Sequence, residues 1–218
     1  PGSTEPGHTL LLNLFDDVVY TALLDRVEYN PENDFTWLGH LQGEPYSQVI
    51  LVVGDGGLVG NITMPDASFQ VRYAGNGVHA VSEIDRSSFP PELPQVQAPT
   101  GDGADTPRSL VGEYDQPTIH LLDVYTTEPK TSAGGSKRMR ELINLAVADP
   151  NQSYEKIQLD QRLNLFHFEE VDYYEETFPV AISHLTHRKD VVMDNFHWLS
   201  DDFCADEAVL LIEDFTAC

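Results

Sequence analysis

Residues 10–81 form a series of short apolar runs, each followed by residues typical of tight turns. The clearest pair is Gln48–Val53 and Leu58–Met64, which flank Gly54-Asp55-Gly56-Gly57. Glycine and aspartate between two apolar runs of strand length predict a β-hairpin. Gly75-Asn76-Gly77 marks a second hairpin of the same kind. Six or more strands at this spacing predict an all-β domain, either a small sandwich or a curled sheet.

The chain has two cysteines, Cys204 and Cys218, and both lie near its C-terminal end. A disulfide framework therefore cannot hold the preceding residues together, and these residues must fold by apolar burial. Hydrophobic residues make up 41% of the 218 residues and aromatic residues 10%. This is enough to build hydrophobic cores, so that wholesale disorder is not expected.

The charge of the chain is strongly acidic, with 12 Lys and Arg against 36 Asp and Glu and a formal net charge of −24. Such a chain repels phosphate backbones, so we do not expect nucleic acid as a partner. One basic group, Lys137, Arg138 and Arg140, lies beside Glu141 and is interpreted as a solvated helix face. No apolar run reaches the ~18 residues of a membrane span, so we expect no membrane partner.

A change of composition divides the chain into segments. Residues 90–108 are rich in Pro, Gly and Asp and are predicted to form an exposed linker, because such a stretch supports neither a sheet ladder nor a helix. We therefore expect a disordered tail or tag remnant at residues 1–9, a β-rich domain at 10–89, the linker at 90–108 and a second domain at 109–218.

The second domain alternates strands and helices, which predicts a mostly parallel sheet covered by helices. Its predicted elements are the strands Thr118–Tyr125, Arg162–Val171 and Ala208–Ile212, a helix starting at Gly134-Gly135-Ser136, and a helix over Val180–Trp198. The first helix should bury one face and be kinked or reset at Pro150. That face consists of Met139, Leu142, Ile143, Ala146 and Val147, continued by Tyr154 and Ile157.

Several short motifs occur in a consistent order along nearly the whole chain. They are residues 12–17 (LNLFDD), 35–39 (FTWLG), 52–56 (VVGDG), 77–81 (GVHAV), 83–85 (EID), 122–126 (LDVYT), 134–135 (GG), 151–154 (NQSY), 169–173 (EEVDY) and 205–218. This ordered set resembles the precursors of bacterial metalloendopeptidases of the peptidyl-Asp type, which belong with the reprolysin-like metzincins.

The resemblance implies a secreted zinc endopeptidase that is made as an inactive precursor. It implies an α+β chain, in which an all-β propeptide domain is followed by an incomplete α/β metzincin-type catalytic subdomain. The zinc-binding H-E-x-x-H motif of such enzymes is absent from residues 1–218 and is expected beyond Cys218. No catalytic residue or zinc ligand is therefore assigned to this chain, which should not hydrolyse peptides by the family mechanism.

The expected partners are the missing C-terminal half of the catalytic domain and a protein or peptide substrate. The alternative interpretation is a catalytically dead pseudoprotease that acts as an extracellular binding module.

Latency and disulfide pairing remain open at this point. No cysteine precedes Cys204, so a propeptide cysteine cannot be bound to the zinc. Asp102 or Asp105 in the linker is one candidate for that task, and simple steric cover of the cleft is the other. The family's equivalent of Cys218 would pair with a cysteine further along, and Cys204 stands where a small residue such as glycine is expected. A Cys204–Cys218 bridge is therefore a hypothesis.

Other residues of types that bind metal ions also have ordinary structural interpretations. His184 and His187 have a spacing that suits a metal on one helix face, with a solvated helix as the alternative. His167 and Glu169 are expected to pair on a strand surface, and His79 and His120 to be satisfied core or interface residues. Calcium is possible because it prefers oxygen-rich loops. The carboxylate clusters are Asp16-Asp17, Asp172 with Glu175-Glu176, Asp201-Asp202 and Asp206-Glu207.

Overall fold

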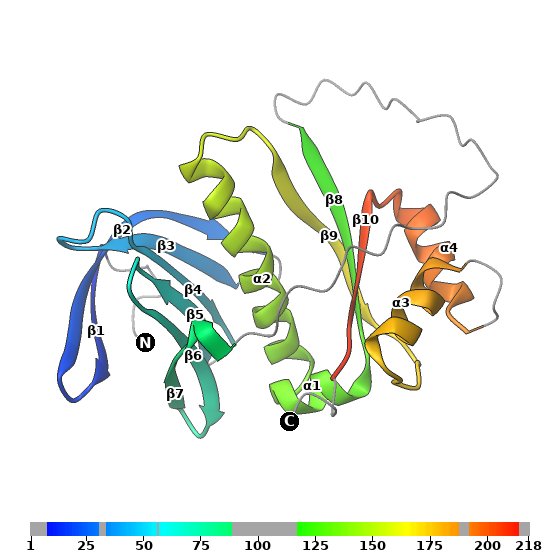
Figure 1. Ribbon diagram of the computed structural model, residues 1–218, viewed down its shortest axis with the longest axis horizontal. Helices are drawn as coiled ribbons and strands as arrows, with labels where there is room; N and C mark the ends of the chain where they lie inside the picture. Colours follow the sequence, from blue (N-terminus) through cyan, green and yellow to red (C-terminus); the bar gives the residue numbers. More distant parts are fainter. Residues whose placement is uncertain (1–7, 31–33, 56, 89–116, 188–191, 214–218) are drawn as a thin grey trace. The chain divides into compact units, whose positions relative to one another are not determined.

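The computed structural model describes residues 8–30, 34–55, 57–88, 117–187 and 192–213, which fall into two compact units (Figure 1). Unit 1 comprises Pro1–Phe89 and Ala133–Pro150, and unit 2 comprises Pro90–Ser132 and Asn151–Cys218. Unit 1 thus takes up a segment that follows the predicted linker. The predicted linker 90–108 and most of the predicted tail 1–9 lie outside the described residues.

Unit 1 is a seven-stranded antiparallel sheet whose strands follow one another in sequence order, from β1 to β7 (Figure 1). The strands are β1 Thr9–Phe15, β2 Val18–Tyr29, β3 Phe35–Leu41, β4 Gln48–Gly54, β5 Gly57–Thr63, β6 Ser68–Gly75 and β7 Val78–Glu83. In a flat sheet β1 and β6 would be about 24 Å apart. The rings of Phe15 and Phe69, on these two strands, have centroids 6.0 Å apart, so the predicted curled sheet is confirmed.

Both predicted hairpins are present, and their turns have the expected chemistry. Gly54 pairs with Gly57 across the first hairpin. In the second, Gly75 pairs with Val78, which leaves Asn76 and Gly77 as the loop. Their φ angles are 52° and 75°, as in the type I′ turn whose twist matches that of the strands.

Strand β4 lies at the centre of the sheet and is buried on both faces. Val49 and Leu51 point into the concave face, where they pack with Trp37 and other side chains of the main core. Ile50 and Val52 alternate with them and face outward, where they pack against helix α2, Ser136–Lys156. The run of apolar residues in β4 therefore reflects two cores, one on each side.

Unit 2 contains a three-stranded parallel sheet, as predicted, and its strands lie in the order β10-β8-β9. Its elements are β8 Thr118–Tyr125, α1 Thr127–Ala133, the end of α2, β9 Arg162–Glu170, α3 Phe178–Thr186, α4 Asp194–Phe203 and β10 Glu207–Leu211. Leu122 and Val124 of β8 pack against Ala181 and Phe196 from the two later helices.

Three details of the helices differ from the sequence predictions. The single helix predicted over Val180–Trp198 is two helices, α3 and α4. Helix α1 was not predicted. Helix α2 continues through Pro150 without a reset, because the carbonyl that loses its hydrogen bond belongs to the exposed Ala146 and can be solvated.

The buried side of α2 also differs from the prediction. Ala146 and Ile157 are exposed, whereas Leu145 and Ala148 are buried. Within the described residues, no helix is both long enough and apolar enough to cross a membrane.

Candidate functional site

A buried ion pair joins the start of α2 to the sheet of unit 1. The Nε of Arg140 donates a hydrogen bond of 2.7 Å to Oδ2 of Asp34, just before β3. The two side chains are 7% and 1% exposed. Removing two opposite charges from water costs several kcal/mol per ion, and this cost is offset only while both partners are present. The pair therefore holds helix α2 against the sheet through two residues that are 106 positions apart in the sequence.

Arg138, two residues earlier in α2, makes a second set of contacts. Its Nη1 donates a 2.7 Å hydrogen bond to the fully buried carboxylate of Glu141. The guanidinium also lies over the ring of Tyr73 in β6, with its central carbon 3.8 Å from the ring centroid, a cation–π arrangement. Lys137 completes the group through an exposed ion pair with Asp55, and its ammonium lowers the pKa of that carboxyl by hydrogen bonding and by charge.

The glycines of the first hairpin allow these charged groups to approach the backbone. A Cβ at Gly57 would overlap the Arg138 guanidinium. A Cβ at Gly54 would overlap Oε1 of Glu141 and lie 2.9 Å from Oδ1 of Asp34. Neither of these oxygens has a hydrogen-bond partner among the residues that the structure describes. The Gly-Asp-Gly-Gly sequence thus provides both the turn and the space for the helix.

Gly54→Ala is expected to lower the free energy of unfolding of unit 1 by about 1–3 kcal/mol, because the added methyl group overpacks a filled space. Urea denaturation gives this value. In a Glu141→Ala background the overlapping oxygen is gone, so the same substitution should cost less. Equal costs in the two backgrounds would show that Glu141 does not fill the space beside Gly54.

The remaining contacts of α2 with the sheet are apolar in the middle and polar at the far end. Leu142, Leu145 and Ala148 pack on four outward-facing residues, Leu38, Ile50, Val52 and Val59. At the end, the carboxylate of Asp149 accepts hydrogen bonds of 3.1 Å from both Gln48 and Asn61. We call the surface formed by Asp34, Asp55, Gln48, Asn61 and the four apolar sheet residues the α2 seat.

The prediction that Lys137, Arg138 and Arg140 form a solvated helix face is wrong for the two arginines. Arg140 is buried and Arg138 nearly so, whereas Lys137 is exposed. Both arginines are largely buried because each is paired with a buried carboxylate, Arg138 with Glu141 and Arg140 with Asp34. Asp34 is distant in sequence, so a local charge pattern cannot identify it as a partner. The available signal was the glycine-rich hairpin, which leaves room for large polar groups.

In unit 2, carboxylates join the carboxyl ends of the parallel strands. Glu175 accepts hydrogen bonds from the Thr126 hydroxyl, after β8, and from the backbone N–H of Glu213, after β10. Glu170 at the end of β9 accepts from Lys130 and Thr127 of α1. The hydrogen bond from Lys130, followed by that from Thr127, lowers the pKa of Glu170. These contacts position α1 over the end of the sheet.

Asp123 is the buried carboxylic acid of the central strand β8 and is 5% exposed. Burial raises the pKa of its carboxyl from 3.8 to about 6, because the charged form is poorly solvated there. The strand was predicted correctly from the sequence, but Asp123 was not among the predicted site residues.

The histidines singled out in the sequence have ordinary partners in the structure, whereas the buried Nε2 of His197 has no hydrogen-bond partner among the described residues. His184 lies 3.1 Å from the Tyr173 hydroxyl, and His187 is the C-cap of α3, 2.7 Å from the Ser183 carbonyl. The predicted pair of His167 with Glu169 is confirmed at 3.1 Å. His79 accepts a hydrogen bond from the backbone of Leu58, and His120 lies 3.4 Å from Asp206.

His79 and His120 are therefore satisfied, as predicted, but both are partly exposed and neither is a core residue.

The predicted latency and disulfide residues are only partly covered by the structure. Asp102, Asp105 and Cys218 lie outside the described residues, so their roles remain predictions. Cys204 is exposed and caps α4 with a φ of 51°, a left-handed conformation that favours glycine.

The residues at hand do not fit a zinc or calcium site in the described part of the chain. No group of three or more His, Cys, Asp or Glu side chains is arranged there to hold a metal ion. Two of the predicted calcium clusters have other contacts, since Glu175 binds Thr126 and Asp206 accepts from the backbone N–H of His120. We therefore assign no chemical step to a metal here.

The chain is similar to known proteins in both units. The model of the BamI lipocalin-like domain matches residues 1–85, the segment that contains all seven strands of unit 1. A protein from Xanthomonas campestris pv. campestris named peptidyl-Asp metalloendopeptidase is 26% identical over 237 residues, covering 100% of this chain and 56% of that relative. One of the same name from Stenotrophomonas maltophilia (strain K279a) is 27% identical over 217 residues, covering 90% and 51%.

The chain thus spans about half the length of the curated relatives it matches. Their names indicate a peptidase-related protein and imply a metal ion in those relatives.

Proposed function

We propose that this chain is the propeptide and N-terminal catalytic subdomain of a secreted zinc metalloendopeptidase precursor that cleaves protein or peptide substrates. The observation that carries the proposal is the extent of the similarity. Proteins named peptidyl-Asp metalloendopeptidase match 90 to 100% of the chain, through both units, and are about twice as long. The remaining half of such a precursor would supply the H-E-x-x-H motif that residues 1–218 lack.

The α2 seat supports a specific task for unit 1 within this proposal. Residues 133–150 follow the predicted linker and yet belong to unit 1. Their apolar side chains Leu142, Leu145 and Ala148 are covered by the lipocalin-like sheet. Most of the stability of a helix in a protein comes from the packing of its apolar face rather than from helix propensity. Unit 1 therefore stabilises the first long helix of the catalytic segment while the rest of the precursor folds.

The test is the intact mass and zinc content of the product of the gene that encodes this chain. We expect a mass well above the 24.3 kDa of these residues and about one zinc per molecule, as in a catalytic metallopeptidase site. A product of 24.3 kDa without zinc would end the peptidase interpretation and favour a binding module.

A further inference from the structure

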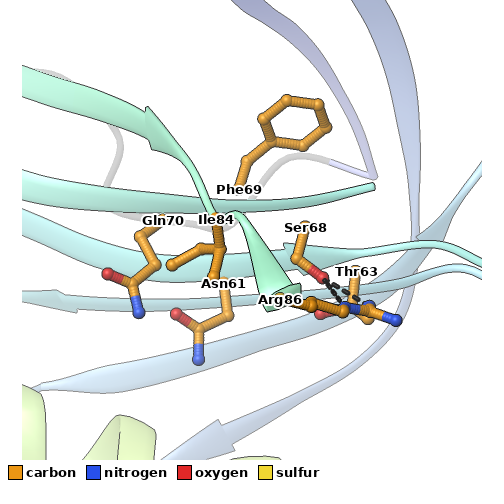
Figure 2. Close-up of a pocket in the computed structure, with 7 residues that line it drawn as sticks. All are labelled: Asn61, Thr63, Ser68, Phe69, Gln70, Ile84 and Arg86. Carbon is orange, nitrogen blue, oxygen red and sulfur yellow. Dashed lines mark hydrogen bonds between the residues drawn. The ribbon is translucent and has the colours of Figure 1, made fainter. Parts of the chain in front are cut away.

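A pocket on the outward face of the unit 1 sheet adjoins the α2 seat, with which it shares Asn61. It has a volume of about 240 Å³ and is lined by residues of β5 and β6 and by two residues that follow β7. Figure 2 shows Arg86, Ser68 and Thr63 at one end and Gln70, Asn61 and Ile84 at the other, while the Phe69 ring points away. A water molecule takes up about 30 Å³ in the liquid. The pocket volume of about 240 Å³ therefore corresponds to several waters, or to a ligand of one or two amino-acid residues.

Arg86 supplies the positive charge of this pocket and binds only neutral oxygens among the described residues. Its Nη2 and Nε donate to the Ser68 hydroxyl at 2.5 and 3.2 Å, and Nη2 also reaches the Met64 carbonyl at 3.4 Å. Its Nη1 has no hydrogen bond within the same residues. Because guanidinium binds carboxylate in a planar, charge-assisted manner, this edge of Arg86 is suited to an incoming carboxylate.

The neighbouring carboxylate does not neutralise Arg86. Asp85 is directed to its own turn, where its two oxygens accept from the N–H and hydroxyl of Ser87 and from the hydroxyl of Ser88. A second hollow of about 460 Å³ shares Ser68, Ile84 and Arg86 with this pocket, and its lining also contains the carboxylates of Asp66, Glu83 and Asp85. These carboxylates repel an anion from the second hollow, whereas the lining of the smaller pocket contains no carboxylate.

The other end of the pocket offers groups that suit a peptide. The Gln70 amide makes no hydrogen bond with the described residues and can both donate and accept, and Ile84 provides an apolar contact. Asn61 is held in place by its hydrogen bond to Asp149 and forms a wall. We propose that this pocket binds the C-terminal carboxylate of a short peptide, with Arg86 and Ser68 on the carboxylate and Gln70, at the other end of the pocket, on a peptide amide.

The experiment titrates the 218-residue chain with acetyl-Ala-Ala as the free acid and as the C-terminal amide, by NMR or calorimetry. We expect the free acid to bind and the amide to bind about tenfold or more weakly, the ratio that loss of a charge-assisted hydrogen bond produces. Arg86→Gln should weaken binding of the free acid by a similar factor. Arg26→Gln removes the same charge on β2, beside Glu28, and should leave binding unchanged.

Gln70→Leu should weaken binding by about threefold, as expected for a neutral hydrogen bond. Inorganic phosphate serves as a competitor. If phosphate displaces the free acid at concentrations similar to those at which the acid binds, the pocket is a general anion site and the proposal fails. If the amide binds as well as the acid, the carboxylate is not recognised and the proposal also fails. Failure of the free acid to bind, or binding that Arg86→Gln does not change, also overturns it. None of these results affects the proposed precursor function, which rests on the similarity to longer relatives and is tested by mass and zinc content.

Discussion

Arg140→Ala is expected to lower the free energy of unfolding of unit 1 by about 3–5 kcal/mol. The substitution leaves the Asp34 carboxylate, 1% exposed, without its guanidinium partner in a place that water does not reach. The loss of stability is large because a buried charge without a partner is poorly solvated. It is therefore larger than the net contribution that the ion pair makes to stability. Urea unfolding followed by tryptophan emission measures it, since Trp37 lies in the unit 1 core and Trp198 of unit 2 is 66% exposed.

Two further variants separate the buried charge from a general effect of the helix. Lys137→Ala removes an exposed ion pair and should cost at most about 1 kcal/mol. Arg140→Met combined with Asp34→Asn removes both charges at similar size and should recover most of the loss. If Arg140→Ala costs no more than Lys137→Ala, the buried pair does not hold α2 on the sheet.

The second large effect concerns the pH dependence of unit 2. We expect Asp123→Asn to have a higher free energy of unfolding than the unsubstituted chain at neutral pH. This difference should grow by on the order of 3 kcal/mol between about pH 4 and pH 7. The pKa of Asp123 is raised from 3.8 to about 6 by burial. Below 3.8 both states of the chain carry the proton and there is no penalty. As the pH rises through about 6 the folded state is destabilised, because the unfolded state ionises more readily.

Urea unfolding followed by the helical circular dichroism signal at several pH values gives this difference. The same substitution at Asp202, an exposed residue of α4, should change the stability by no more than about 0.5 kcal/mol at any pH. A difference between Asp123→Asn and the unsubstituted chain that is constant with pH would show that Asp123 keeps its ordinary pKa in the folded state.

Local signals in the sequence were sufficient for the sheets. The Asn76-Gly77 turn and the Gly54–Gly57 hairpin have the chemistry that is typical of β-hairpin turns, and such turns fix the register of the strands that flank them. The apolar run of β8 likewise identified a buried parallel strand. The split between α3 and α4 was missed because apolar residues lie on both sides of the charged residues 188–190, and this charged stretch was the available sign of a break.

The candidate site was less predictable because its partners are distant in sequence. Arg140 meets Asp34 across 106 positions, and periodicity carries no information about such pairs. Asp123 was visible as a carboxylate within Leu-Leu-Asp-Val-Tyr, and a charge inside an otherwise apolar strand is a signal that can be used. The pocket at Arg86 depends on the curvature of three strands and has no sequence signature.

Unit 1 is assembled from two stretches of chain that are not contiguous, Pro1–Phe89 and Ala133–Pro150. Cleavage of a peptide bond between them would therefore produce two fragments that remain associated, because the apolar contacts of Leu145 and the Arg140–Asp34 pair do not depend on chain connectivity. Excision of the first fragment and its departure are then two separate events. The protease sets the rate of the first, and the α2 seat determines how long the nicked complex survives.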